Sequence, residues 1–389
     1  MTKATGKSCL IIAGEKSGEE HALSFFKELR FNSPDTKFFG VGGVDLKLAG
    51  MELLYNLKDF SSWGYSDVIF KIPFYIKAMN HILDEVEKRN CKVAILVDYQ
   101  SFNLKLAGKL KARGIEVLYY VAPQAWAWKE YRVKKLSSYV NTLFTIIPFE
   151  KNWFRERGVK KVISIDHPLW TTYEKDLASF SGKLFDNNSK NPMRLLLLPG
   201  SRHFEVQLLL PEFLQSIISL KKEFPLEVSI VKSSSVKEEL YEPYNQYFDK
   251  VYTNDDLVTA LKNADFSIAA SGTVTLTCAL FEVPTVVCYK TSLLNAFIFE
   301  AIVRYKWFIS LANIIQNRAV FPELLQDQVS SYNIVSHLKF WYYNKSEYLE
   351  LKEQLKQTKK LVRGEGVDIP QFIANVINNS YGKKPDTLT

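Results

Sequence analysis

The sequence predicts an α/β protein built from two doubly wound, Rossmann-like halves. Apolar runs rich in β-branched residues alternate with helical patterns from Cys9 to about residue 174, and the same alternation begins again at Met193. Strands that alternate with helices are typical of βαβ units in a parallel sheet. The chain of 389 residues is also longer than one ordinary core needs and suits two domains.

The first half, residues 1–174, opens with the strand pattern "CLIIAG", which begins at Cys9. This run leads straight into a glycine turn and lacks a small-residue cleavage site, so we interpret it as a strand rather than a signal peptide. Further strands are expected at "KVAILVDY", "EVLYYVAP" and "TLFTIIPF", and helices at "GEEHALSFFKELR", "NLKLAGKLKARG" and "EKNWFRERG".

A polar stretch rich in Ser and Asn, residues 175–192, is expected to be a linker or an excursion between the halves. Strand patterns resume with "MRLLLLPGS" and continue with "LEVSIVKS", "KVYTN", "FSIAAS" and "PTVVCYK", so the second half spans residues 193–381. The tail after about Tyr381 is expected to be frayed. Ligands of doubly wound sheets bind beyond the carboxyl ends of the strands, which is where we look for chemistry.

The composition narrows the class of protein. The four cysteines lie far apart without C-x-x-C pairing, which favours a reducing compartment, and the five histidines are scattered, so no metal site is expected. No window reaches the ~18 uninterrupted apolar residues of a membrane-spanning helix, and we expect a cytoplasmic protein. The net charge of +8 favours an acidic partner: nucleic acid, a nucleotide or an anionic membrane face. The lysines are dispersed along the sequence and are not clustered in a basic patch, which argues against a nucleic-acid binder.

The first strand end of interest is "AGEKSGEE". Gly14 and Gly18 flank Glu15 and Ser17 at a strand-to-helix turn, where the backbone either approaches a ligand closely or turns sharply. The stretch is neither a G-x-G-x-x-G motif nor a P-loop. The alternative interpretation is an ordinary helix start, with Ser17 as the N-cap and Glu20 three residues later.

A second strand end, "LLLLPGSRHFEV", places Gly200, Ser201 and Arg202 where a helix should begin. Backbone N–H groups, a positive helix end and an arginine fork together suit a diphosphate. The alternative is a surface arginine on a plain turn.

A third strand end, "AASGTVTLTCAL", repeats this arrangement with Ser271, Gly272 and Thr273. Hydroxyl and amide groups again stand at an expected helix start. Two anion-binding turns in one half suggest that a nucleotide diphosphate binds there.

The segment "WGYSDVIFKIPFYIKAMNHIL" combines aromatic and aliphatic residues with Lys71 and Lys77. An apolar face flanked by lysines suits a membrane interface, and anionic lipid would add attraction. The alternative is an ordinary buried helix kinked by Pro73. The residues expected to contact membrane or acyl chains are Trp63, Val68, Ile69, Phe70, Phe74 and Tyr75.

Taken together, these segments resemble lipid-A-disaccharide synthase, a glycosyltransferase family with two Rossmann-like domains facing a central cleft, the GT-B arrangement. The matching blocks run in family order from about residue 10 to residue 328. They include "AGEKSGEE", "PQAWAW", "LLLLPGSRHFEV", "SGTVTLTCAL" and "LANIIQNRAVFPELLQ", of which the second and the last are specific to the family.

The resemblance implies a reaction between UDP-2,3-diacylglucosamine and 2,3-diacylglucosamine 1-phosphate that gives a β-1,6-linked acylated disaccharide phosphate and UDP. The family inverts the anomeric centre and uses no metal or other cofactor, so a base should deprotonate the acceptor 6-hydroxyl while positive groups stabilise the leaving diphosphate. Family members are peripheral proteins of the cytoplasmic face of the inner membrane and can dimerise through the C-terminal half. In this chain, the C-terminal half is expected to bind the UDP-sugar, and its C-terminal helices are expected to pack back on the N-terminal domain.

The resemblance also assigns roles to individual residues. Arg202, Asn313 and Glu15 match catalytic positions, while Glu323 matches the acid before "LLQ" in the nucleotide site. The remaining nucleotide-binding positions are Gly200, Ser201, Ser271, Gly272 and Thr273.

Three positions depart from the family pattern. The family reads D-x-P-D-F where this chain has Asp98 and Ser101, and the second aspartate is the proposed base; a serine hydroxyl without a neighbouring base is far too weak. Asp98 becomes the candidate base, although it lies too far back to occupy the same spot without a different loop path. Thr277 replaces a ribose-binding glutamate, a loss of about 1–3 kcal/mol. Asp166 replaces a glycine before His167, so either the turn tolerates a positive φ at aspartate or its path differs.

Three functions therefore compete. The first is a working synthase in which Asp98 or Glu15 serves as the base. The second is a GT-B enzyme acting on a different UDP-amino sugar without fatty acyl chains, which leaves the aromatic segment without a purpose. The third is a non-catalytic paralogue, favoured by Ser101 and Thr277 and opposed by the retention of Arg202.

Overall fold

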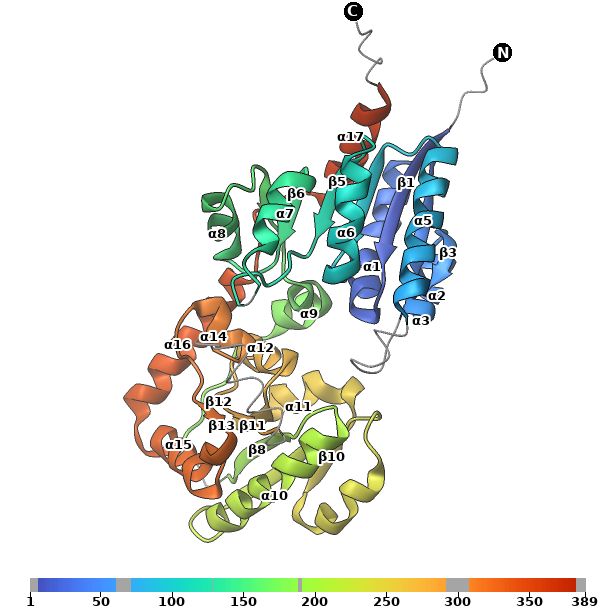
Figure 1. Ribbon diagram of the computed structural model, residues 1–389. Helices are drawn as coiled ribbons and strands as arrows, with labels where there is room; N and C mark the ends of the chain where they lie inside the picture. Colours follow the sequence, from blue (N-terminus) through green and yellow to red (C-terminus); the bar gives the residue numbers. More distant parts are fainter. Residues whose placement is uncertain (1–5, 61–70, 128, 188–190, 292–307, 383–389) are drawn as a thin grey trace, which may run out of the picture. The chain divides into compact units, whose positions relative to one another are not determined.

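The computed structural model describes residues 6–60, 71–127, 129–187, 191–291 and 308–382 (Figure 1). The chain divides into a first unit, residues 1–168 with 363–389, and a second unit, residues 169–362. Helix α9 (Pro168–Ser179) packs within the second unit, where the rings of Tyr173 and Phe281 lie 5.8 Å apart. The beginning of the expected linker at residues 175–192 is therefore helical.

The first unit contains a seven-stranded sheet in the order β3-β2-β1-β4-β5-β6-β7, and every pairing is parallel. Its strands are β1 (Lys7–Ala13), β2 (Thr36–Gly42), β3 (Glu52–Asn56), β4 (Val93–Val97), β5 (Glu116–Tyr120), β6 (Thr142–Thr145) and β7 (Val162–Ser164). Its helices are α1 (Lys16–Asn32), α2 (Val44–Leu48), α3 (Leu57–Phe60), α5 (Ile72–Lys88), α6 (Gln100–Lys111), α7 (Arg132–Tyr139), α8 (Glu150–Glu156) and α17 (Ile369–Gly382).

Two hydrophobic cores cover the two faces of this sheet. Leu10 and Ile12 of β1 belong to the core that includes α5, α6 and α7, whereas Cys9 and Ile11 belong to the core with α1 and α17. Because both faces are buried, the central strands read as continuous apolar runs instead of alternating patterns. Helix α17 is thus a structural part of the first unit, although it lies at the other end of the chain.

The second unit contains a six-stranded parallel sheet in the order β10-β9-β8-β11-β12-β13. Its strands are β8 (Met193–Leu198), β9 (Leu226–Val231), β10 (Lys250–Tyr252), β11 (Phe266–Ala270), β12 (Thr285–Tyr289) and β13 (Glu323–Leu325). Besides α9, its α-helices are α10 (His203–Leu220), α11 (Leu257–Asn263), α12 (Thr273–Leu280), α14 (Leu311–Gln316), α15 (Ser331–Tyr343) and α16 (Lys345–Leu361). Short 3₁₀ helices are η1 (Glu238–Leu240), η2 (Glu242–Tyr247), η3 (Asn254–Asp256) and η5 (Gln326–Gln328).

The strand order reverses between β1 and β4 in the first unit and between β8 and β11 in the second. The helices that follow such a pair of strands cover opposite faces of the sheet, which leaves a crevice at the carboxyl ends where ligands bind. The segments "AGEKSGEE", "LLLLPGSRHFEV" and "AASGTVTLTCAL" lie at the carboxyl ends of β1, β8 and β11, and Asp98 lies at the carboxyl end of β4.

The chain crosses between the units twice, and within the first unit the two crossings are tied together. The Asp166 carboxylate accepts a hydrogen bond of 2.7 Å from the backbone N–H of Gly364, and Glu365 N–H donates to Ser164 C=O. A Cβ atom on Gly364 would lie 2.5 Å from the backbone of Ile165, so only glycine allows this approach. Asp166 does not adopt a positive φ. The Asp166 side chain thus makes a specific hydrogen bond that the glycine expected from the family pattern could not make.

Helix α5 begins at Ile72 with Pro73 in its first turn, so the proline starts the helix rather than kinking it. In the described part of the chain, no helix is long and apolar enough to span a membrane.

Candidate active site

Two carboxyl groups meet at the carboxyl ends of β1 and β4. Ala13 and Val97 are paired in register. Glu15 lies two residues after Ala13 and Asp98 directly follows Val97, so the two carboxyl side chains come within hydrogen-bonding reach. Burial and the neighbouring Glu15 carboxylate raise the pKa of Asp98 to about 7. The pair can therefore hold or release a proton near neutral pH.

The loop after β4 takes an unusual path that directs Asp98 toward Glu15. Asp98 and Tyr99 are both left-handed, with φ of 46° and 42°. A left-handed residue that is not glycine is strained and persists only where its surroundings fix it. At Asp98, hydrogen bonds fix both the backbone N–H and the backbone C=O. Asp98 N–H donates to Tyr120 C=O at 2.9 Å, and Asp98 C=O accepts from the Tyr119 hydroxyl at 2.8 Å and from the Asn103 amide at 2.9 Å.

The Tyr99 ring explains why Gly14 has no side chain. A Cβ atom on Gly14 would lie 2.6 Å from the ring of Tyr99. The Tyr99 hydroxyl donates to Phe60 C=O at 3.0 Å and contacts the Tyr75 hydroxyl at 3.2 Å. The ring is thus clamped between β1 and the start of α5, and it fixes the left-handed turn.

Ser101 occupies the first turn of α6 and is exposed. Ser17 also lies inside a first turn, because α1 begins at Lys16 with Glu15 as its N-cap residue. The interpretation of Ser17 as the cap is wrong: the helix starts one residue after the strand turn, earlier than the capping pattern indicates. This early start is what brings Glu15 to the strand end.

The loop after β5 borders the same edge of the sheet. Its first residue, Val121, has a φ of 65°, which is strained for a β-branched side chain. Further along, the indole N–H of Trp126 donates to the buried Glu150 carboxylate at 2.9 Å, and burial raises the pKa of Glu150 to about 7. Residues with a strained, left-handed backbone therefore follow both β4 and β5, which are neighbours in the sheet. Such strained residues cluster at active sites and ligand-binding sites.

In the second unit, the first glycine turn is filled by a carboxylate of the chain itself. Glu205 of α10 accepts hydrogen bonds from the backbone N–H groups of Ser201 (3.0 Å) and Arg202 (3.2 Å) and from Arg202 Nη1 (3.1 Å). Gly200 has a φ of 113°, and a Cβ atom there would collide with the Glu205 side chain. The Arg202 side chain is anchored at one nitrogen, yet 70% of its surface is exposed.

The second glycine turn is open. Among the described residues, a Cβ atom on Gly272 would meet nothing within 4 Å, and both Gly272 and Thr273 are exposed at the start of α12. The Ser271 hydroxyl donates to Ile309 C=O at 3.1 Å, which ties this turn to the segment before α14. Of the two turns predicted to bind a diphosphate, this one has room for it.

Asn313 and Glu323 lie in one hydrogen-bond network. The buried Asn313 amide donates to Phe321 C=O (2.9 Å) and to Glu323 (2.8 Å) and accepts from the N–H groups of Val320 (2.9 Å) and Phe321 (2.8 Å). Glu323 also accepts from the N–H groups of Ile309 and Ser310. Every hydrogen-bonding position of the Asn313 amide is used inside the protein, so the geometry favours an organising role for it.

Thr277 is buried on α12 and lies within hydrogen-bonding reach of the Tyr173 hydroxyl. Its hydroxyl therefore points into the unit instead of toward the open turn. This position of the Thr277 hydroxyl does not favour the ribose contact expected of a glutamate there.

The predicted membrane segment is only partly described. Trp63, Val68, Ile69 and Phe70 lie outside the described residues. Phe74 and Tyr75 are half-buried, and both rings pack against Phe60 at 5.4 and 5.8 Å.

Two residues that sequence reasoning missed shape these edges. Glu205 stands three residues after Arg202, and this spacing is the signal of a capping box that could have revealed it. Tyr99 gives no such signal, because nothing local in the sequence indicates a ring folded back over Gly14. Within the described ranges, no cluster of three His, Cys, Asp or Glu side chains could hold a metal ion.

The two Rossmann-like units, each with polar groups at its strand-order reversal, place the chain in the GT-B structural class. Solved structures agree over nearly the whole chain: a UDP-GlcNAc 2-epimerase from Neisseria meningitidis bound to UDP-GlcNAc (TM-score 0.53, 13% identity, 96% of this chain and 99% of that one) and the calicheamicin glycosyltransferase CalG4 (TM-score 0.56, 12% identity, 98% and 99%). At such identities the likeness establishes the fold alone.

The chain belongs to the lipid-A-disaccharide synthetase family, whose model matches residues 9–373. A lipid-A-disaccharide synthase from Myxococcus xanthus is 34% identical over 334 residues, covering 85% of this chain and 86% of the relative. One from Nitrosococcus oceani is 33% identical over 82% of this chain and 83% of the relative, and one from Francisella philomiragia is 30% identical over 96% and 99%. The resemblance stated from sequence motifs is thus confirmed.

Proposed function

We propose that this protein is an inverting glycosyltransferase that joins UDP-2,3-diacylglucosamine to 2,3-diacylglucosamine 1-phosphate. The products are a β-1,6-linked acylated disaccharide 1-phosphate and UDP. The observation that carries the proposal is the Asp98–Glu15 carboxyl pair at the central strand ends of the first unit, because this reaction needs a base there.

Asp98 serves as the base in this proposal. The acceptor 6-hydroxyl oxygen forms a bond to the anomeric carbon of the donor, and the bond from that carbon to the diphosphate oxygen breaks. The hydroxyl proton passes to Asp98, and UDP leaves with the electron pair. Glu15 supports this role, because its negative charge raises the proton affinity of Asp98 toward the value a base needs near neutral pH.

The second unit supplies the groups for the leaving diphosphate. In the open turn, the backbone N–H of Ser271 donates to Cys288 C=O, while Gly272 and Thr273 present their N–H groups at the positive end of α12. Arg202 contributes a positive charge, and Glu205 holds one of its nitrogens while the rest of the guanidinium stays exposed. Charge that develops on the leaving oxygen is stabilised by such fixed donors.

Because the proposed substrates carry fatty acyl chains, we propose that the enzyme is a peripheral protein at the cytoplasmic face of the inner membrane. In support, Ile72 and Ile76 at the start of α5 are 48% and 57% exposed, beside the exposed Lys77. Flotation with anionic and neutral vesicles tests this: co-flotation with neither would contradict it. The resemblance also predicts a homodimer, and the molar mass from light scattering on the purified protein tests this prediction.

A non-catalytic paralogue is the second candidate. Thr277 faces Tyr173, and Glu205 fills the first glycine turn, so two expected nucleotide contacts are altered. A GT-B enzyme for a different UDP-amino sugar is a further alternative, and donor analogues without acyl chains would reveal it.

The deciding measurement is UDP release by purified protein given the acylated UDP-sugar in detergent micelles, with and without the acylated 1-phosphate acceptor. Release that requires acceptor and yields the disaccharide supports the proposal. Folded protein that binds UDP but releases none from several acyl variants would favour the paralogue.

A further inference from the structure

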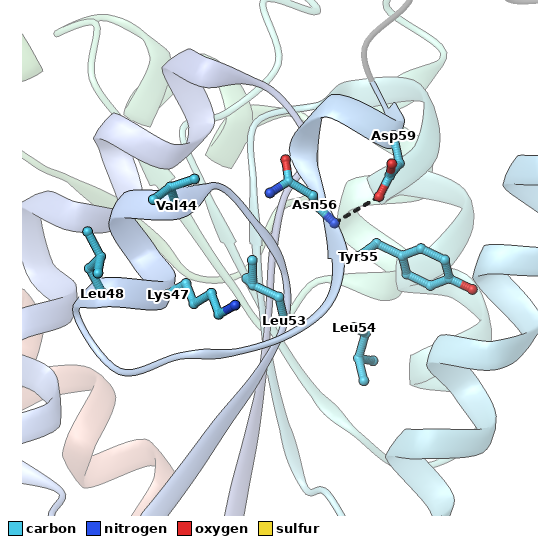
Figure 2. Close-up of a pocket in the computed structure, with 8 residues that line it drawn as sticks. All are labelled: Val44, Lys47, Leu48, Leu53, Leu54, Tyr55, Asn56 and Asp59. Carbon is cyan, nitrogen blue, oxygen red and sulfur yellow. Dashed lines mark hydrogen bonds between the residues drawn. The ribbon is translucent and has the colours of Figure 1, made fainter.

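An open hollow of about 690 Å³ lies at the outer edge of the first unit, between α2 and the edge strand β3 (Figure 2). Val44, Lys47 and Leu48 line it from one face of α2, as their helical spacing requires. Leu53 faces them from β3, and Lys47 extends from α2 toward Leu53 in Figure 2. Its volume lies in the range of small-molecule sites.

Part of the wall of this hollow is apolar, and none of the described residues covers it fully. Leu48 is 80% exposed and Val44 is 55% exposed, which is unusual for two neighbouring aliphatic residues on one helix face. Leu53 and Leu54 are half-buried at the strand edge. A ligand with a hydrocarbon portion would gain free energy by covering these side chains.

The helix that lines the hollow is attached to the helix that begins at the candidate active site. Lys16, the residue after Glu15, forms an ion pair of 3.0 Å with Asp45, which neighbours Val44. The buried Glu19 of α1 accepts a hydrogen bond from Leu46 N–H at 3.1 Å and also lies against Gly43. The start of α2 is therefore fastened to the first turn of α1, beside the carboxyl pair.

The dimensions and charges suit an extended chain attached to a polar head. From Leu53 to Asn56 the edge strand advances about 10 Å at ~3.3 Å per residue. Asn56 and Asp59 make the polar end of the hollow, near the carboxyl edge of the sheet, and the exposed Lys47 lines its wall. A polar sugar head with a hydrocarbon tail complements this arrangement of a polar end and apolar side chains.

We infer that this hollow holds a fatty acyl chain of the acceptor substrate while the acceptor sugar lies at Asp98 and Glu15. The inference rests on the proposed function and adds the place where chain length is sensed. Each methylene that enters the hollow should lower the acceptor KM about fourfold, until the hollow is full.

The test compares acceptors of increasing acyl length, below their micelle concentrations, with the native protein, a Val44→Ser/Leu48→Ser variant and a Phe31→Ser variant. Phe31 is a matched control, since it is 84% exposed on the same unit but outside the hollow. We expect the dependence of KM on chain length to flatten in the double variant, by about tenfold or more for the longest acceptor, and to stay intact in Phe31→Ser. Equal dependence in the native protein and the double variant would overturn the inference while leaving the proposed function in place.

A second measurement keeps the inference testable if the native protein transfers no sugar at all. A fluorescent long-chain fatty acid is titrated into each protein, and vesicle flotation is measured in parallel. Weaker fatty-acid binding by the double variant alone supports an acyl site. A defect confined to vesicle flotation would mean that this face contacts the bilayer instead, and would also overturn the inference.

Discussion

The two units place opposite chemistry at equivalent positions of similar sheets. At the strand-order reversal of the first unit, two carboxyl groups stand together and one of them holds its proton up to about neutral pH. At the reversal of the second unit, the strands end in glycine turns, a helix start and an exposed arginine. The fold therefore supplies the position, whereas the side chains decide whether that position takes up a proton or attracts an anion.

A second difference lies within the second unit itself. Its two glycine turns look alike in sequence, but Glu205 fills the turn after β8, whereas no side chain in the described part of the unit fills the turn after β11. A helix start that binds its own carboxylate is satisfied, and one left open is available to a ligand.

The strongest way to break the comparison between the units is Asp98→Asn. The amide cannot take a proton, so we expect turnover to fall on the order of 1000-fold, in the range for removal of a general base. UDP release at saturating substrates measures the effect, and Ser101→Ala, an exposed neighbour on α6, should change it less than twofold. Turnover that survives Asp98→Asn would remove Asp98 from the base role.

The same variant has an opposite effect on stability. The pKa of Asp98 is about 7 in the folded chain against an ordinary value of 3.8, so the folded state holds a proton that the unfolded state has released. Stability from this group is complete below pH 4 and is lost as the pH rises toward 7. Asp98→Asn should therefore unfold at a higher temperature than the native protein at pH 8, with a smaller gain at pH 5.

Arg202→Ala tests the proposed diphosphate contact of the second unit and should give the next largest loss of activity. Loss of a charge-assisted hydrogen bond to the diphosphate costs about 1.5–3 kcal/mol, which corresponds to a fall of roughly 10- to 150-fold in kcat/KM. The matched control is Arg113→Ala, which removes a surface ion pair with Glu87 in the first unit. An equal fall in both variants would indicate a general loss of charge instead of a diphosphate contact.

Glu15→Gln tests whether Glu15 sets the pKa of Asp98 in the first unit. A base must be deprotonated, so kcat/KM of the native protein should rise with pH through about 7. Removing the Glu15 charge lowers the pKa of Asp98, so this rise should move to lower pH. A pH profile that stays in place would show that Glu15 does not tune Asp98.

Glu205→Ala should have the smallest effect and distinguishes the filled turn from the open one. The N–H groups of Ser201 and Arg202 lose their partner, so we expect about 1 kcal/mol less stability, as for other helix caps. Urea unfolding measures it. Ser271→Ala at the open turn leaves no backbone N–H without a partner and should cost less; the reverse order would contradict the distinction.

The sequence predicts the strands well because buried parallel strands are continuous apolar runs, and each expected run became a strand of one of the two sheets. It also locates Glu15 and Asp98 at strand ends. It could not show that they touch, since this depends on β1 and β4 being neighbours, a long-range pairing. The left-handed path through Asp98 and Tyr99 is equally hidden, because it is held by Gly14, Phe60 and Tyr119 from distant segments.

The position of α17 has a consequence for how the chain is made. Ile373, Ala374 and Ile377 of this helix complete a core whose other members come from the beginning of the chain. A ribosome releases the second unit as one continuous stretch, residues 169–362, before α17 exists. The first unit is therefore begun first and completed last, and until α17 has been synthesised one face of its sheet lacks part of its cover. A fragment that stops at Pro168 repeats this unfinished state permanently, so the first unit is studied on its own only when residues 363–382 are rejoined to it.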